Sequence, residues 1–433
     1  MVKILYTKSK KFEIEFQKLI KKREKDDFEI DKVVEQIIKD VKNKSDNALI
    51  QLTEKFDGFN VKNIDELVVK NKEIQNSYNL LNKQTKKSLK NAITRVANYH
   101  KKQKPSNNMY KDKEGVLLGG VWNPIESVGL YVPGGTAAYP SSLIMNAVPA
   151  KVAGVERIAV AVPATRGEVN PLVLASCKML KIDEIYKIGG AQAISALALG
   201  TKKIPKVDKI FGPGNAYVAS AKKKFFGTVG IDMIAGPSEI LVMADSKNDP
   251  EHIAIDLLSQ AEHDNLAQSI LVTDSEEFAK KVIRSVNIFL AKIKRKEIAK
   301  RSWNDYGAVI ICESLKKSVN LVNKIAPEHL EIATDNPRRF LKKIKNAGAI
   351  FLGRYTPEAI GDYVAGPNHV LPTDRTARFT SGLNLLDYYK RSSVVCCNKK
   401  NLKTIGKDAI ILAYEEGLQA HALSIECRLN KIY

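Results

Sequence analysis

The sequence predicts an α/β protein with two Rossmann-like parallel-sheet domains, an N-terminal helical arm and a C-terminal helical tail. Short apolar runs begin near Ser127, and each run ends at Gly or Pro before a helix-like stretch, which is typical of βαβ units. The same rhythm resumes near Glu239, which indicates a second unit. A chain of 433 residues is long enough for two or three domains of about 150 residues.

The expected division of the chain has four parts. Residues 1–25 form the arm, and residues 126–239 form one Rossmann-like domain. Residues 26–125 combine with 240–379 as the other α/β domain. Residues 380–433 form a tail with one helix over about 408–429, and this tail has too little apolar surface to fold alone.

Composition excludes large-scale disorder, because 44% of the residues are hydrophobic and 27% are charged. No run approaches the roughly 18 apolar residues of a membrane span, and the first residues lack the apolar block of a secretory signal. The five cysteines form no C-x-x-C pair, which fits a reducing compartment. We therefore expect a cytoplasmic protein.

The net charge of +21 raises the alternative of a nucleic-acid-binding protein. The lysines are spread among glutamates without interleaved aromatic residues, however, which favours solvated helix faces. Residues 1–120 carry much of this lysine, with the spacing of several amphipathic helices. His100 lies in a lysine-rich stretch and is expected at the surface.

Three glycine-containing turns follow predicted strands and could hold a nucleotide, because helix N-termini there offer free amides to phosphate. These turns are Pro133-Gly134-Gly135, Gly189-Gly190 and Gly212-Pro213-Gly214-Asn215. The last begins GPGNAY, in which Tyr217 replaces the third glycine of a dinucleotide fingerprint. Such turns also close strands in proteins that bind nothing, so nucleotide binding stays open at this point.

A helix is predicted after Asp249, a good cap, with Pro250 in its first turn. Gln260 and His263 lie three residues apart on one face near its end, a spacing that suits two ligands of one metal ion. His252 lies in the first turn and outside this pair. A lone histidine on a helix is usually structural, so the metal interpretation is weak by itself.

Two further segments carry acidic and imidazole side chains. Glu328 and His329 stand at a predicted strand start and offer two proton-transfer groups, although a polar turn explains them equally well. Asp362 and His369 lie in a Gly/Pro-rich loop.

Glu416 and His421, near the C-terminus, diverge by about 140° on a regular helix, so they could face one site only from different sides or with a broken helix. Glutamine, aspartate and histidine together form a nitrogen and oxygen ligand set that Zn²⁺ accepts.

These segments resemble the histidinol dehydrogenase family in their order and in their amino-acid sequence. The matching motifs are VGLYVPGG, GGAQAI, DKIFGPGNAYV, AGPSEILVMAD, DLLSQAEHD, PEHLEI, GDYVAGPNHVLPT and EGLQAH. The resemblance runs from about Gly120 to His421 and is loose over the first hundred residues. It implies a zinc-dependent, NAD-linked oxidoreductase that oxidises L-histidinol to L-histidine through L-histidinal, at the end of histidine biosynthesis.

The resemblance also assigns roles. It places one Zn²⁺ per subunit on Gln260, His263, Asp362 and His421. It makes Glu328 and His329 the proton-transfer pair. Substrate contacts fall on the ligands and His329, and also on Ser238, His369 and Glu416. NAD contacts fall on Tyr131, Gln192 and Asn215. The metal and catalytic residues then belong to the domain of 26–125 with 240–379, and NAD to 126–239.

The family is similar in being a homodimer with exchanged segments, so the tail 380–433 is expected to complete the neighbour's site. One departure is visible: Asp374 and Arg375 stand where the family usually has glycines. In the mechanism that we expect, neutral His329 removes the hydroxyl proton, and Glu328 activates the water that hydrates the aldehyde.

Two other chemistries stay open. A zinc hydrolase could use Glu328 as its base, and an aldehyde could be oxidised through a thiohemiacetal on Cys312 or Cys397. No sequence neighbour of either cysteine lowers its pKa.

Overall fold

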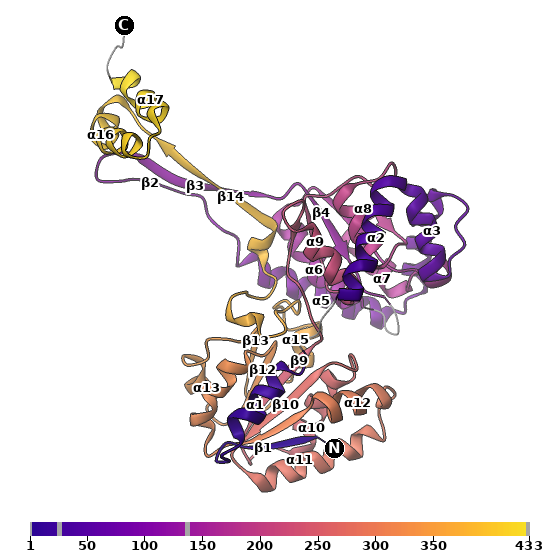
Figure 1. Cartoon of the computed structure of the whole chain (residues 1–433). Helices are drawn as coiled ribbons and strands as arrows, with labels where there is room; N and C mark the ends of the chain where they lie inside the picture. Colours follow the sequence, from indigo (N-terminus) through magenta and orange to yellow (C-terminus); the bar gives the residue numbers. More distant parts are fainter. Residues whose placement is uncertain (1, 24–27, 135–138, 430–433) are drawn as a thin grey trace.

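The computed structural model describes residues 2–23, 28–134 and 139–429. Two α/β bodies lie next to each other, and a long three-stranded sheet leaves one of them and carries the last two helices away from both (Figure 1). The predicted fold class is confirmed. None of the described helices is long and apolar enough to cross a membrane.

The first body is built on a five-stranded parallel sheet in the order β6-β5-β4-β7-β8. Its strands are β4 (Ser127–Tyr131), β5 (Arg157–Ala161), β6 (Ile185–Tyr186), β7 (Lys209–Phe211) and β8 (Gly230–Ile231). The helices between them are α6 (Pro140–Ala153), α7 (Pro171–Leu180), α8 (Gly190–Leu199) and α9 (Ala216–Phe225). The chain starts centrally and winds outward to both sides, as in half of a Rossmann fold.

The second body contains a six-stranded parallel sheet in the order β1-β11-β10-β9-β12-β13. The strands are β1 (Lys3–Tyr6), β9 (Glu239–Ala244), β10 (Gln268–Thr273), β11 (Ala308–Ile311), β12 (His329–Ala333) and β13 (Ala349–Leu352). The helices are α10 (Pro250–Ala261), α11 (Glu276–Leu290), α12 (Lys296–Tyr306), α13 (Leu315–Ile325), α14 (Arg338–Leu341) and α15 (Glu358–Tyr363). From β9 onward the winding repeats that of the first sheet.

The N-terminal arm belongs to this second body. Its first element is the strand β1, which pairs in parallel with β11, rather than a helix. The helix α1 (Phe12–Lys21) follows, and it buries Phe16 and Leu19 against the sheet. The strand β1 therefore joins a sheet whose other strands begin more than 230 residues later in the chain.

Helices from the N-terminal region cover the first body instead of the second. They are α2 (Phe28–Lys44), α3 (Asp46–Asp57), α4 (Asn71–Leu80) and α5 (Lys83–Lys101). The helix α2 packs on α8 and α9, α4 on α7, and α5 on α6. This packing differs from the expected grouping of residues 26–125 with 240–379, because the apolar stripes of these helices complete the core around the five-stranded sheet.

His100 is fully buried, so the expectation of a surface residue is wrong. It continues the apolar face of α5 that carries Leu89, Ala92 and Val96, at the spacing of one helix face. Its Nδ1 lies 2.9 Å from the carbonyl oxygen of Val96. The surrounding lysines occupy the opposite face, and helical periodicity therefore decides burial here more than local composition does.

The C-terminal tail contains a strand and two helices rather than one helix. The strand β14 (Tyr389–Cys396) pairs antiparallel with β3 (Leu117–Pro124), which also pairs with β2 (Asn108–Lys111). Beyond it, α16 (Lys399–Glu415) and α17 (Gln419–Leu429) are separated at Gly417, whose φ is +73°. Glycine adopts this left-handed conformation without steric cost, so the helix stops there.

Candidate functional site

The candidate catalytic residues lie at the amino ends of two adjacent strands in the six-stranded sheet. Glu239 is the first residue of β9, and His329 is the first residue of β12, in register with Ile240. The predicted strand start at His329 is confirmed. The helices α10 and α13 also end at this edge, because each leads into the next parallel strand.

Four predicted residues converge on this edge from α10, α15 and the loop after it. Asp249 caps α10 by accepting a hydrogen bond from the Glu251 amide at 2.8 Å, and this places Gln260 in the last turn and His263 just beyond it. Gln260 Nε2 lies 3.1 Å from His329 Nδ1. Asp362 Oδ1 lies 3.6 Å from His369 Nδ1.

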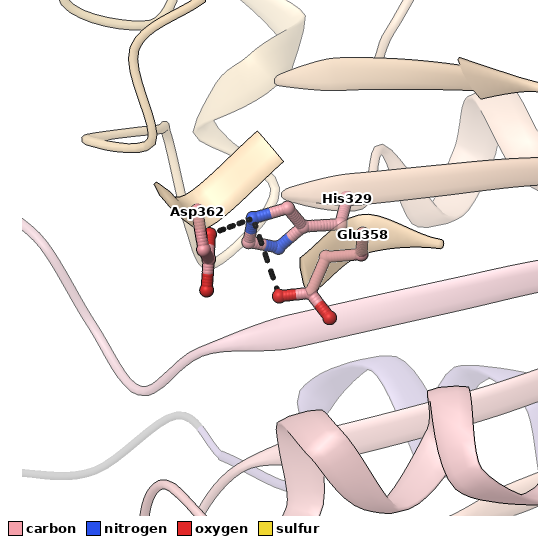
Figure 2. Close-up of side chains that lie close together, drawn as sticks. All are labelled: His329, Glu358 and Asp362. Carbon is pink, nitrogen blue, oxygen red and sulfur yellow. Dashed lines mark ion pairs between the residues drawn. The ribbon is translucent and has the colours of Figure 1, made fainter. Parts of the chain in front are cut away.

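The His329 ring has a defined tautomer. Its Nδ1 lies 2.9 Å from the carbonyl oxygen of Glu239, which can only accept, so we assign the hydrogen to Nδ1. The lone pair on Nε2 faces Asp362 Oδ1 at 3.8 Å and Glu358 Oε1 at 4.0 Å (Figure 2). Burial lowers the pKa of His329 to about 4, so the imidazole is neutral at pH 7.

The site has donor atoms without partners, as a cation site requires. Gln260 Oε1 and His329 Nε2 are buried and have no hydrogen-bond partner among the described residues. Burial tends to raise the pKa of Asp362, but the hydrogen bond and charge of His369, with His329 and His263, hold it at about 2. Asp362 is therefore ionised. Amide oxygen, imidazole and carboxylate are ligands that Zn²⁺ accepts, so these residues fit the metal.

His263 lies at the rim of this group. Its residue surface is largely exposed, although the surrounding protein lowers the pKa of its ring and the charge of Asp362 opposes that effect. His263 is therefore accessible from outside the chain, and the charge of the half-buried Asp362 acts on it.

Glu328 is buried directly beside the histidine. Its Oε2 accepts a hydrogen bond from the Glu239 amide at 2.7 Å and lies 3.6 Å from His329 Nδ1. Burial raises the pKa of Glu328 well above its usual value, Asp362 raises it further, and Arg23 opposes both. Ser238 is half-buried at the start of β9, where its carbonyl accepts the Gln268 amide at 2.9 Å.

The three predicted cofactor residues lie at the carboxyl ends of the five-stranded sheet. Tyr131 ends β4, and its hydroxyl accepts a hydrogen bond from the Gly190 amide at 3.1 Å. Gln192 is buried in the first turn of α8. Asn215 caps α9 by accepting from the amides of Tyr217 and Val218, each at 3.1 Å. Gly135, from the first predicted turn, lies outside the described residues.

Glu416 and His421 are not brought to this site within one chain. Both are exposed, beside the break between α16 and α17. These helices lie at the far end of the three-stranded sheet, away from α10, β12 and α15 (Figure 1). The helix is broken between them, which is one of the two arrangements that would let both face one site.

Sequence reasoning missed Glu239, Glu358 and Arg23. Glu358 stands four residues before Asp362, so both occupy one face of α15, and that spacing was the available signal. Glu239 was missed because it begins a run of apolar residues that predicts a buried strand. Arg23 contacts residues more than 200 positions away, which no local pattern reveals.

Asp374 and Arg375, noted as a departure, have φ values of +49° and +63°. Glycine suits this left-handed region, which explains why a glycine pair would fit here.

The two cysteines considered as nucleophiles are elsewhere. Cys312 follows β11 at the carboxyl edge of the six-stranded sheet, and burial raises its pKa to about 11. Cys397 is exposed beyond β14 in the tail. Neither lies at the edge that carries His329, which disfavours the thiohemiacetal route.

Comparison with known proteins identifies the family of the chain. Residues 20–429 match the family model described as histidinol dehydrogenase. The chain is 51% identical over 404 residues to the histidinol dehydrogenase of Rhodospirillum rubrum (93% of each chain) and 52% identical over 419 residues to that of Rhizobium meliloti (97% and 96%). A crystal structure of histidinol dehydrogenase from Elizabethkingia anophelis superposes with a TM-score of 0.93 at 36% identity, over 99% and 98% of the chains. With matches of this extent, the chain belongs to the histidinol dehydrogenase family and is an oxidoreductase.

Proposed function

We propose that this enzyme carries out the zinc-dependent, NAD-linked oxidation of L-histidinol to L-histidine through L-histidinal. The observation that carries this proposal is the neutral, unpartnered Nε2 of His329, which faces the ionised Asp362 in a group that also holds an unpartnered Gln260 oxygen. A general base therefore stands beside a set of side chains that can ligate a metal ion. An alcohol held by that set would present its hydroxyl proton to the base.

Gln260, His263 and Asp362 would hold Zn²⁺, with His421 of the partner subunit as the fourth ligand. When bound, the metal would orient the imidazole and amino nitrogens of the substrate, and NAD would accept hydride. His369, Ser238 and the partner subunit's Glu416 would contact the substrate. Glu358 touches the same group and is an additional candidate to support Asp362.

The two buried bases divide the work in this proposal. His329 removes the hydroxyl proton in the first oxidation through its free Nε2, and its Nδ1 hydrogen bond to Glu239 fixes the ring. Glu328 activates the water that hydrates the aldehyde. His329 then acts as base again in the second oxidation. Burial excludes bulk water from both side chains, since each is less than 10% exposed.

We place NAD on the turns at the carboxyl ends of β4, β6 and β7, with Tyr131, Gln192 and Asn215 in contact with it. The N-termini of α8 and α9 lie at these turns, where the positive ends of their helix dipoles would favour a pyrophosphate. On this view the cofactor domain includes residues 126–239 together with α2–α5, which complete its core.

The enzyme works as a homodimer in this proposal, with each tail completing the neighbouring site. The tail cannot serve its own chain, because the three-stranded sheet holds α16 and α17 away from β12 (Figure 1). Apolar side chains exposed on these helices and at the break between them would be covered by a partner; they are Ile411, Leu412, Tyr414, Leu418 and Leu423. Five free cysteines suit a reducing compartment such as the cytoplasm.

The decisive experiment is NADH formation from L-histidinol, measured by absorbance with and without a chelator. We expect two NADH per histidinol from the zinc-loaded enzyme, loss of turnover on chelation, and recovery when Zn²⁺ is restored. Zinc-loaded protein that forms no NADH would contradict the proposal. Turnover of an ester or amide without NAD would instead support a hydrolase. Tight, salt-dependent binding to duplex DNA or RNA would support a nucleic-acid-binding protein.

A further inference from the structure

Arg23, at the end of the N-terminal arm, reaches the amino edge of the six-stranded sheet. Its guanidinium donates to the carbonyl of Pro237 at 3.1 Å and to Asp374 Oδ1 at 2.9 Å. It also forms an ion pair with Glu239. The side chains of Arg23 and Glu239 are only 8% and 5% exposed, so their ion pair is largely shielded from water, whereas the Asp374 side chain is 47% exposed. One arginine thus joins the arm, the start of β9 and the loop that follows His369.

Glu239, which receives Arg23, is tied reciprocally to Glu328. The Glu239 amide donates to Glu328 Oε2 at 2.7 Å, and the Glu328 amide donates to Glu239 Oε2 at 3.2 Å. The other carboxylate oxygen of Glu239 accepts from Arg23 and from the Asp374 amide at 2.8 Å. The orientation of the Glu328 side chain therefore depends on where Glu239 is held.

Glu239 also fixes the orientation of the His329 ring. The carbonyl oxygen of Glu239 accepts a hydrogen bond from His329 Nδ1, and it accepts another from Gln260 Nε2 at 3.2 Å. A shift of Glu239 would consequently move the base, the residue that activates water and one proposed metal ligand. Geometric errors of this kind are costly, because a displacement of about 1 Å can reduce a rate by about 10²-fold.

We propose that Arg23 is a positioning residue of the active site, which holds Glu328 and His329 in their working orientation by fixing Glu239. This inference rests on the proposed roles of Glu328 and His329. Arginine suits the task because its planar fork donates several hydrogen bonds in fixed directions, which a lysine ammonium cannot reproduce. It also supplies positive charge to a buried group that holds the carboxyl groups of Glu239 and Glu328.

The test is Arg23→Gln in the full-length, zinc-loaded enzyme. We expect kcat for histidinol oxidation to fall about 10- to 100-fold, as is typical when a residue supporting a site is lost. The KM for NAD should stay within about twofold, because the cofactor turns are in the other body. Arg23→Lys should recover only part of the loss. A kcat within about twofold of wild type would overturn the inference.

Arg354→Gln is the matched control. Arg354 also bridges three groups of this sheet, but at its carboxyl edge. These groups are the carboxylates of Asp245 and Asp335 and the carbonyl of Ala333. The Arg354→Gln substitution should change kcat little. If both variants lower kcat and thermal stability in parallel, the role of Arg23 is merely structural and the inference fails.

A double-mutant cycle with Glu239→Gln tests the proposed route. If Arg23 acts through Glu239, Arg23→Gln should cost less than about twofold in kcat once Glu239 is already changed. Full additivity of the two losses would show that Arg23 acts independently and would contradict the inference.

Hydrogen exchange at the Glu239 and Glu328 amides gives a readout without turnover. Both should exchange faster in Arg23→Gln than in wild type or Arg354→Gln, because the side chains that accept from them are loosened. Unchanged exchange would contradict the inference even if the wild type formed no NADH. Wild-type NADH formation with an unaffected Arg23→Gln variant would leave the proposed function standing and remove only the role of Arg23.

Discussion

The two sheets have the same winding order, yet opposite edges carry their candidate sites. In the five-stranded sheet, Tyr131 ends a strand, and Gly190 and Asn215 follow the carboxyl ends of two others. In the six-stranded sheet, Glu239 and His329 begin strands. The difference lies in the helix ends that meet each edge. N-termini meet the first edge and favour anions, whereas the C-termini of α10 and α13 meet the second and favour cations.

This contrast would let one fold hold the two unlike ligands that we propose. A pyrophosphate is best placed where amides are free, and a metal ion where carbonyls and carboxylates collect. The first edge uses backbone and amide groups, and the second uses ionisable side chains in a buried setting. Substitutions at one edge should therefore leave the chemistry of the other largely intact.

The largest effect is expected at the catalytic edge. Glu328→Gln should slow the aldehyde-to-acid half-reaction by about 10²–10⁴, because a general base typically contributes that much, and leave the first oxidation far less affected. Single-turnover NADH formation from histidinol and from histidinal measures each half. His329→Gln is the comparison variant and should slow both halves. Equal slowing of both halves by Glu328→Gln would refute the division of labour.

The next effect concerns a buried ion pair under the cofactor edge. Lys222 and Asp232 are 2% and 1% exposed and hold both polar atoms of the Gly212 backbone: Lys222 Nζ donates to its carbonyl at 2.9 Å, and Asp232 accepts its amide at 2.8 Å. Lys222→Met should lower the free energy of unfolding by about 3–5 kcal/mol, because it leaves a buried carboxylate unpaired. Urea denaturation measures this. A loss below about 1 kcal/mol would mean that the pair is dispensable.

A smaller effect should separate the two edges most cleanly. Gln192→Ala should raise the KM for NAD about tenfold, the equivalent of one lost hydrogen bond of roughly 1.4 kcal/mol. Zinc content, measured on the purified protein, should stay unchanged. Gln260→Ala is the reciprocal variant, which should lose zinc and keep its affinity for NADH. Zinc loss from Gln192→Ala would show that the edges are coupled.

The smallest effect is a pH dependence on the cofactor side. Asp57, at the end of α3, has a buried Oδ2 without a partner among the described residues, and burial raises its pKa to about 6. Its protonated form therefore favours folding, a contribution that is complete below about pH 4 and lost as the pH rises through 6.

Asp57→Asn should accordingly stabilise the fold at pH 7 by about 1 kcal/mol, a value reduced for its partial exposure, and by nothing at pH 3.5. Thermal unfolding at both pH values measures the difference. Equal effects at the two pH values would show that the charge of Asp57 is not responsible.

Local patterns predicted the placement of several candidate site residues on their elements. Asp249 and Pro250 fixed the start of α10, so the positions of Gln260 and His263 followed from helix geometry. The fold class followed from two runs of βαβ segments. The sequence did not predict that α2–α5 cover the five-stranded sheet. An apolar stripe indicates that a helix packs against something, but it does not indicate which sheet the helix covers.

His100 was misplaced since lysine-rich composition says nothing about the opposite helix face. Arg23 and Glu239 could not be found because their roles arise from contacts between segments far apart in the chain.

The pairing of β1 with β11 has a consequence for synthesis on the ribosome. Residues 3–6 must wait for residues 308–311, about 300 residues later, which at about 5–20 residues per second takes roughly 15–60 s. During that interval the sheet that carries Tyr131, Gln192 and Asn215 is fully translated. We therefore expect the nascent chain to complete the five-stranded sheet first, and Arg23 to reach its place only when β1 pairs with β11 in the six-stranded sheet.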